Sequence, residues 1–169
     1  MGYTHYWDAP TAHPDYAAAW PCIITDTQAI ITAVRGAGIV IAGPDGFGRP
    51  LLDAEGIAFN GDATGDLDYE AFVLAAPGPV PRFEHLFCKT GRRPYDLAVA
   101  AVLLRCHLLL PEVFRIGSDG DWDREWLHGA IPPALDAQDP VPSPRRLVAD
   151  LFGPIPDASP LRRPMTWRA

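Results

Sequence analysis

The organisation of the chain is decided by residues 87–96, which read Phe87-Cys88-Lys89-Thr90-Gly91-Arg92-Arg93-Pro94-Tyr95-Asp96. An apolar strand over 83–88 ends here, Gly91 permits a tight turn, and Pro94 opens a helix that runs to about Leu110. This helix is apolar almost all round, which is typical of a helix at the centre of a domain. The segment therefore predicts a strand, a turn and a buried helix in succession.

Strand and helix signals alternate irregularly on both sides of this segment. Alternating or apolar runs predict strands over 2–7, 38–42, 56–60, 69–75, 83–88 and 113–116. Helical spacing predicts helices over 21–35, over 94–110, from about 122 and over 146–152. Because strict βαβ alternation is missing, we expect an α+β fold. Its sheet is expected to be mixed or antiparallel, with about five to six strands and two to three helices packed mainly on one face.

Length and composition indicate one globular domain with a proline-rich extension. The chain has 169 residues, of which 48% are hydrophobic and 21% charged, as in globular domains. Residues 131–169 hold nine of the nineteen prolines. We therefore expect residues 1–130 to form a single core domain. Residues 131–169 are expected to wrap that core or to contact a protein partner or a second copy of the chain.

Charge, hydropathy and cysteine usage narrow the classes of function. A net charge of −7 argues against a nucleic acid duplex or an anionic membrane as partner. No apolar run reaches the ~18 residues of a membrane-spanning helix, and the first residues lack the pattern of a secretory leader. We therefore expect a cytoplasmic location. The three cysteines form no CxxC pair and the histidines no HxxxH pair, so no metal or cofactor is expected.

The basic residues of the 87–96 segment form the strongest candidate site. The chain has thirteen arginines and a single lysine, Lys89. Arginine cannot replace a lysine that has to lose a proton or act as a compact point charge. Together with Arg92, Arg93 and the Thr90 hydroxyl, Lys89 lies beside the expected helix N-terminus. Free N–H groups and the helix dipole favour phosphate or carboxylate there.

A second interpretation of the same segment requires no ligand. In it, Thr90 or Asp96 satisfies backbone donors at the start of the helix. The cations then face water or pair with the acidic run over 53–70, which holds six carboxylates and no basic residue. The sequence leaves both interpretations open.

Three further residues stand out by their surroundings. His5 lies in an aromatic strand pattern; it can act as acid or base only if a carboxylate such as Asp96 or Asp119 lies nearby, and otherwise it is a packed core residue. Asn60, the only asparagine, suits either a turn or an amide that orients a polar ligand. Cys88 is expected to be a buried structural thiol.

Several of these segments occur in an order that resembles a known family. They are Met1-Gly2-Tyr3-Thr4-His5-Tyr6-Trp7, Phe59-Asn60-Gly61, Glu70-Ala71-Phe72, Phe87-Cys88-Lys89-Thr90, Arg93-Pro94-Tyr95-Asp96 and Ser118-Asp119-Gly120. The order resembles a family of small uncharacterised bacterial and phage proteins that begin MGYTHYW and carry an FCKTxRxPYD core, over roughly residues 1–128. The family usually has a lysine at the position of Arg93, so the resemblance implies that only a cation is needed there. It also implies that the motif residues converge on one cleft, but it carries no function to transfer.

The sequence as a whole favours a site for a small anionic ligand, phosphate-bearing or nucleotide-like, centred on Lys89 and the N-terminus of the 94–110 helix. Its expected ligand contacts are Tyr3, Asn60, Thr90, Arg92, Arg93, Tyr95 and Asp119. Turnover of the ligand stays open. If it occurs, the expected catalytic residues are His5 or Asp96 as acid or base and Lys89 as electrostatic stabiliser, base or amine nucleophile. The alternative is a non-enzymatic interaction module that uses the acidic loop and the proline-rich tail.

Overall fold

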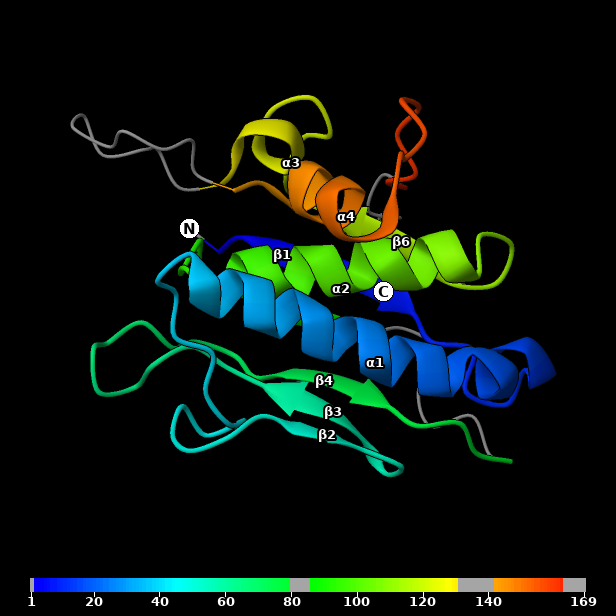
Figure 1. Cartoon of the computed structure of the whole chain (residues 1–169), viewed down its shortest axis with the longest axis horizontal. Coiled ribbons are helices and arrows are strands. Elements are labelled where there is room, and N and C mark those ends of the chain that lie inside the picture. Colours follow the sequence, from blue (N-terminus) through cyan, green and yellow to red (C-terminus); the bar gives the residue numbers. More distant parts are fainter. Residues whose placement is uncertain (1, 80–85, 131–141, 163–169) are drawn as a thin grey trace, which may run out of the picture.

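Ten elements of secondary structure make up the described part of the chain. The computed structural model describes residues 2–79, 86–130 and 142–162 (Figure 1). In chain order the elements are β1 (Thr4–Asp8), α1 (Pro14–Gly36), β2 (Leu51–Asp53), β3 (Gly56–Phe59), β4 (Phe72–Ala75), β5 (Leu86–Lys89), α2 (Asp96–Leu109), β6 (Arg115–Ser118), α3 (Glu125–His128) and α4 (Pro144–Phe152).

The strands form two antiparallel sheets of three strands each, in the orders β5-β1-β6 and β2-β3-β4. The α+β class is confirmed, whereas the expectation of five to six strands in one sheet is wrong. β1 is already bonded on both edges by β5 and β6, so the β3–β4 hairpin completes its sheet with β2 instead. Sequence reasoning misses β2 because three residues are too few to show strand periodicity.

The two sheets meet at the motif segments. The backbone N–H of Glu70 donates to the carbonyl of Lys89 (3.2 Å), and the ring of Trp7 on β1 packs on that of Phe72 on β4, with centroids 5.2 Å apart. Side chains of both sheets therefore contribute to one core.

Helix α1 begins at Pro14, seven residues before the predicted start at Pro21. Nδ1 of His13 accepts a hydrogen bond from the backbone N–H of Asp15 (3.1 Å), which caps the helix, and Pro14 suits the first turn. Pro21 is accommodated inside the helix. The strand expected over 38–42 is reduced to one bridge, Ala42 with Asn60.

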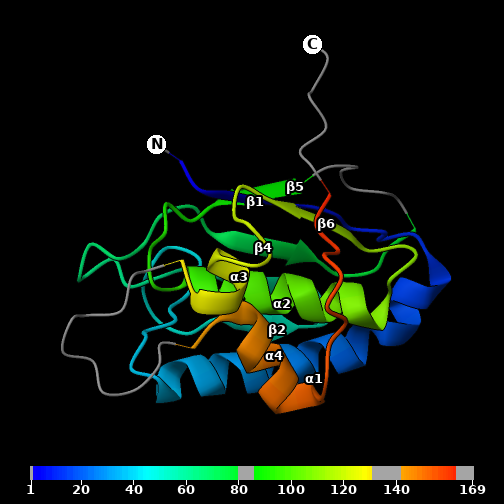
Figure 2. The same ribbon diagram turned by 90° about the horizontal axis from the view of Figure 1, so that it is seen from above.

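Helix α2 is the central element, as its apolar sequence predicts. Its residues 96–104 are all buried, and it packs against α1, α4, β1 and β6. Figure 2 shows α1, α2 and α4 on the same side of the β5-β1-β6 sheet. With α3, the described part of the chain has four helices rather than two to three.

The described part of the proline-rich segment is joined to this core. Leu147 and Val148 of α4 are buried in the core cluster. Beyond α4, the backbone N–H of Arg162 donates to the carbonyl of Ile116 on β6 (2.9 Å), so the chain runs alongside that strand (Figure 2). Residues 131–141 and 163–169, and the part of the expected 83–88 strand before Leu86, lie outside the described residues.

One helix in the described ranges, α1, is long and apolar enough to cross a membrane by length and composition alone. Core helices pass the same test. The buried residues of α1 include Ile23, Ile30, Ile31 and Val34.

Candidate functional site

His5 on β1 is the centre of a buried polar network, and its ring hydrogen-bonds to residues of two other elements. The side chain is fully buried, with 0% of its surface exposed. Its Nε2 lies 2.7 Å from Oδ1 of Asp96, the first residue of α2, and its Nδ1 lies 3.0 Å from Oγ of Ser118, the last residue of β6. The structure thus places the predicted pair of His5 and Asp96 in direct contact and adds Ser118, which sequence reasoning missed.

The hydrogen bonds of Ser118 determine the tautomer of His5. Ser118 Oγ accepts from the backbone N–H of Gly120 (2.9 Å) and from Nε1 of Trp126 (3.2 Å), which uses both of its lone pairs. The Ser118 hydrogen is therefore donated to Nδ1 of His5. With this assignment Nε2 of His5 carries a hydrogen and donates it to Asp96.

Ser118, His5 and Asp96, hydrogen-bonded in this order, have the connectivity of an acyl-transfer triad, but their surroundings differ from those of a triad. A nucleophilic serine needs an oxygen lone pair that faces a substrate. Here both lone pairs of Ser118 are bonded to α3 and to the Gly120 turn, and the residue is buried. The network therefore connects β1, β6, α2 and α3 as an internal structural unit.

The N-terminus of α2 is occupied by the chain itself. Oδ1 of Asp96 accepts from the Thr90 hydroxyl as well as from His5, and a carboxylate there is favoured by the helix dipole. The first-turn amides of Asp96, Leu97 and Ala98 donate to the carbonyls of residues 93, 94 and 95. The second sequence interpretation is wrong in its capping role, because Thr90 and Asp96 bond to each other and no side chain caps α2, although Arg93 does pair with Asp66 of the acidic run. The first-turn amides are bonded within the chain and are not available to a ligand.

Tyr3 is packed inside the network instead of lining a cleft. It is 3% exposed, and its ring meets that of His5 edge-on, with centroids 5.2 Å apart. The absence of a side chain at Gly120 makes room for the Tyr3 hydroxyl, since a Cβ there would collide with it. Burial, and next the charge of Asp96, raise the pKa of Tyr3 well above its usual value. Above the ring lies the Arg92 guanidinium, 4.2 Å from the centroid.

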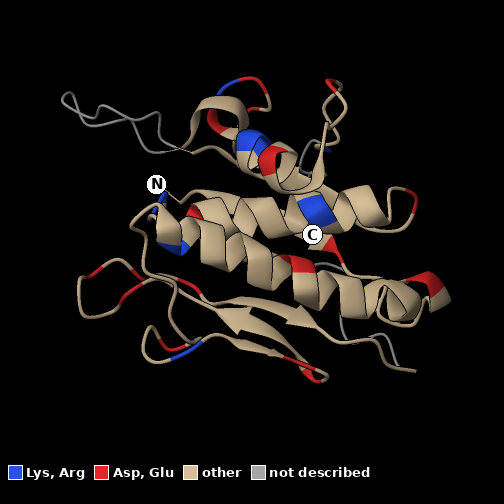
Figure 3. Cartoon of the chain, in the orientation of Figure 1, with Lys and Arg blue, Asp and Glu red and all other residues tan. Residues whose placement is uncertain are grey.

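The three cations of the motif differ in their partners. Figure 3 shows how basic and acidic residues are distributed along the ribbon. Arg92 is 3.5 Å from Glu125, and Arg93 is 3.9 Å from Asp66. Lys89 is exposed, its Nζ lies 6.0 Å from the Phe87 ring centroid, and no carboxylate of the described residues is within 4.0 Å of that nitrogen. Lys89 is therefore the motif cation whose charge is least compensated locally.

Asn60 uses its complete hydrogen-bonding capacity inside the protein. Its Nδ2 donates to the carbonyls of Pro44 (3.2 Å) and Tyr69 (3.0 Å), while Oδ1 accepts from the N–H groups of Gly61 (2.8 Å) and Tyr69 (3.1 Å). Two donors and two acceptor positions are all that an amide has. The Asn60 side chain therefore holds the loop segments around Pro44, Gly61 and Tyr69 together. Neither its amide nitrogen nor its oxygen remains available to orient a ligand.

Two other expected ligand contacts are also engaged within the chain. Buried Tyr95 donates from its hydroxyl to the carbonyl of Glu70 (2.6 Å). Asp119 accepts from the N–H of Thr4 (3.0 Å) and from the Tyr6 hydroxyl (3.4 Å), which holds the start of β1. Among the predicted site residues, Lys89, Arg92 and Asp119 are exposed and Arg93 is half-buried.

The expectation that Cys88 is a buried structural thiol is confirmed. Its exposure is 0%, and burial raises the pKa of this thiol to about 12. At neutral pH the thiolate needed for nucleophilic chemistry is therefore scarce.

Comparison with protein-family models, with curated proteins and with solved structures found no match to this chain. The resemblance to the MGYTHYW family consequently stays a prediction. The fold and the site together define an α+β protein with a buried polar network around His5, beside which Lys89 and Arg92 are exposed.

Proposed function

We propose that the protein binds a small anionic ligand, phosphate-bearing or nucleotide-like, at the surface formed by Lys89, Arg92 and Arg93. The observation that carries this proposal is the exposed ammonium of Lys89, which has no carboxylate of the described residues within 4.0 Å. Lys89 is also the one lysine of the chain, and a compact ammonium suits a phosphate oxygen.

The ion pairs of the two arginines are exchangeable for a ligand. The Arg93–Asp66 contact is long, at 3.9 Å, and the Asp66 side chain is 94% exposed. Exposed pairs of this kind contribute only about 0–1 kcal/mol. A phosphate group replaces such a partner at little cost and forms charge-assisted hydrogen bonds in return.

The stacking of Arg92 on Tyr3 supports the same site. Because the Tyr3 ring is fixed in the network, it holds the guanidinium in one place and lowers the entropy cost of ordering that side chain on binding. Since first-turn amides of α2 are already bonded, charge rather than backbone N–H groups provides the attraction. The expected ligand affinity is therefore strongly dependent on salt.

Turnover is the second step of the proposal and depends on His5. Both ring nitrogens are bonded, so His5 acts as acid or base only after it releases Ser118 or Asp96. For an enzyme, His5→Ala should abolish turnover of a bound nucleotide while ligand binding is retained. Equal loss of both, or of neither, in a folded variant would count against His5 as an acid or base.

Thermal unfolding in the presence of ligands tests the binding site. Wild type, Lys89→Ala and Lys89→Arg are each titrated with inorganic phosphate, nucleoside monophosphates, sugar phosphates and citrate. Ligand at about 100 times its Kd stabilises the fold by roughly 2.7 kcal/mol, which is easily measured. We expect a shift that disappears in Lys89→Ala. The control is Arg146→Ala on α4, whose exposed side chain lies outside the motif. No shift with any ligand, or an equal shift in Lys89→Ala, would contradict the site.

A second candidate function is a protein-interaction module that uses the acidic loop and the tail. The 94% exposure of the Asp66 side chain favours it, because this carboxylate is open to a basic partner. A deletion from residue 131 would remove the core helix α4 and so could not separate binding from folding. Asp66→Asn combined with Asp68→Asn is the sharper test. If that variant still bound a protein partner as well as wild type does, the acidic loop would not be part of the interaction surface.

A further inference from the structure

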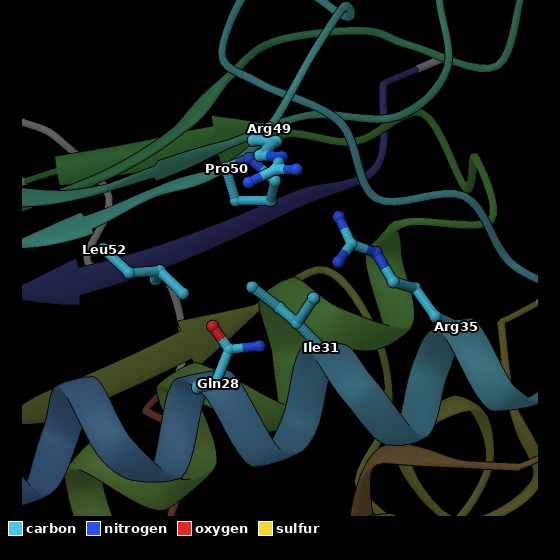
Figure 4. A pocket seen from close by; sticks show the side chains of 6 residues that line it. All are labelled: Gln28, Ile31, Arg35, Arg49, Pro50 and Leu52. Atoms are coloured by element: carbon cyan, nitrogen blue, oxygen red, sulfur yellow. The ribbon is translucent and has the colours of Figure 1, made fainter.

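A hollow of about 410 Å³ lies between α1 and the segment that leads into β2, remote in sequence from the motifs (Figure 4). One wall is a single face of α1, because residues 28, 31 and 35 have the three- and four-residue spacing of neighbours on a helix. The other wall is the chain before and within β2. The lining residues are Gln28, Ile31, Arg35, Arg49, Pro50 and Leu52.

The polar and apolar groups of this hollow are separated. Figure 4 shows Leu52 and Ile31 directed toward each other across the space, while the guanidinium groups of Arg35 and Arg49 face it from another side. Pro50 and Leu52 are half-buried and offer apolar surface to the hollow, whereas Ile31 is 0% exposed and belongs to the core. An occupant with an apolar body and one polar head fits such an arrangement.

The charge of the hollow is positive and uncompensated by its own lining. The lining includes two arginines and no carboxylate. Arg35 donates from Nη2 to the carbonyl of Ile41 (2.7 Å). This neutral partner fixes the side chain but does not neutralise its charge. Neither arginine forms an ion pair within 4.0 Å with any described residue. The chain as a whole has a net charge of −7, so the positive charge of the hollow is a local property.

We propose that this hollow binds a small organic oxyanion, with a carboxylate or phosphate head on Arg35 and Arg49 and an aliphatic or aromatic body on Pro50 and Leu52. Guanidinium groups match the planar fork of a carboxylate and also bind phosphate. The volume is within the range of small-molecule sites. This site is separate from the proposed site at Lys89 and does not depend on it.

Calorimetric titration with three probes of equal chain length tests the proposal. Octanoate and octyl phosphate carry the two head groups, and 1-octanol has the same body without charge. We expect at least one anion to bind one per chain, about ten-fold or more tighter than 1-octanol. A preference for one anion identifies the head group. Absence of binding by both anions, or equal affinity for 1-octanol, would overturn the proposal.

Matched variants locate the binding. Arg49 is exposed, so Arg49→Gln should fold normally while it weakens the bound anion about ten-fold. Arg146→Gln on α4 removes the same charge elsewhere and should leave the affinity unchanged. In addition, amide chemical shifts of residues 28–35 and 49–52 should move with octanoate in wild type. Equal affinity in both variants, or shifts confined to other segments, would overturn the site.

Discussion

Around His5 the polar side chains are bonded to other parts of the protein, whereas in the hollow beside α1 two guanidinium groups face open space. Ser118 and His5 use all their hydrogen-bonding positions inside the network. Arg35 and Arg49 have no carboxylate partner among the described residues. A dense sequence motif can thus report how a fold is held together, while groups available to a ligand lie where the sequence is less conspicuous.

Asp96→Ala should give the largest effect, because it breaks the buried network. The substitution leaves the Nε2 hydrogen of His5 without an acceptor, and the Thr90 hydroxyl keeps only the more distant carbonyl of Tyr3 (3.5 Å). Removal of one member of a buried pair typically costs about 3–5 kcal/mol of unfolding free energy. Urea unfolding measures it, with Asp150→Ala on the exposed side of α4 as control. A loss below about 1 kcal/mol would mean that the network is not a structural unit.

The two amide side chains offer a direct comparison of the regions. Asn60→Ala leaves buried backbone groups of two loops unpaired, so we expect a loss of about 2–3 kcal/mol. Gln28→Ala, at the exposed hollow, should change the free energy of unfolding by less than about 0.5 kcal/mol. Chemical denaturation of both variants measures the difference. Equal losses of unfolding free energy in the two variants would contradict the distinction between polar groups with all hydrogen bonds formed and polar groups exposed at the hollow.

Acid should weaken the fold slightly through Glu125, which joins the network region to Arg92. Burial acts to raise the pKa of Glu125, but hydrogen bonds from the backbone N–H of Asp121 and its own, with the charge of Arg92, bring it below the usual 4.5. Its stabilising contribution is therefore complete above about pH 4.5 and is lost as the pH falls through the lower folded pKa.

The expected contribution is below about 1 kcal/mol, because the group is near the surface. Unfolding of wild type and Glu125→Gln is compared at pH 7 and pH 3. The difference in unfolding free energy between the two proteins should disappear at pH 3. A gap that is the same at both pH values would exclude this ionisation as its origin.

The smallest effects on stability, and the sharpest on binding, are expected at the two basic sites. Lys89→Ala and Arg49→Gln should each change the free energy of unfolding by less than about 0.5 kcal/mol, because both side chains are exposed. Each should weaken only its own ligand, phosphate compounds for Lys89 and octanoate for Arg49. Thermal shifts with both probes measure this. If either substitution abolished binding of both ligands, the two proposed sites would have to be a single site.

Much of the fold can be predicted from local patterns. The apolar run of α2, the alternation in β1 and the helix of α4 all occur near their predicted positions. The three-residue β2 is missed and the start of α1 is misplaced, since a short strand has no period and a proline inside a helix has the same signature as one at its start.

The sequence by itself determined the α+β class, the central buried helix and the proximity of motif residues to element ends. It also marked His5 and Asp96 as potential partners. Only the tertiary structure decided that Ser118 and Trp126 complete their network and that Asn60 is fully bonded. It alone placed Arg35 across a hollow from Arg49. The physical reason is that hydrogen-bond saturation and cavities depend on segments distant in the chain, whereas periodicity and capping depend on neighbours.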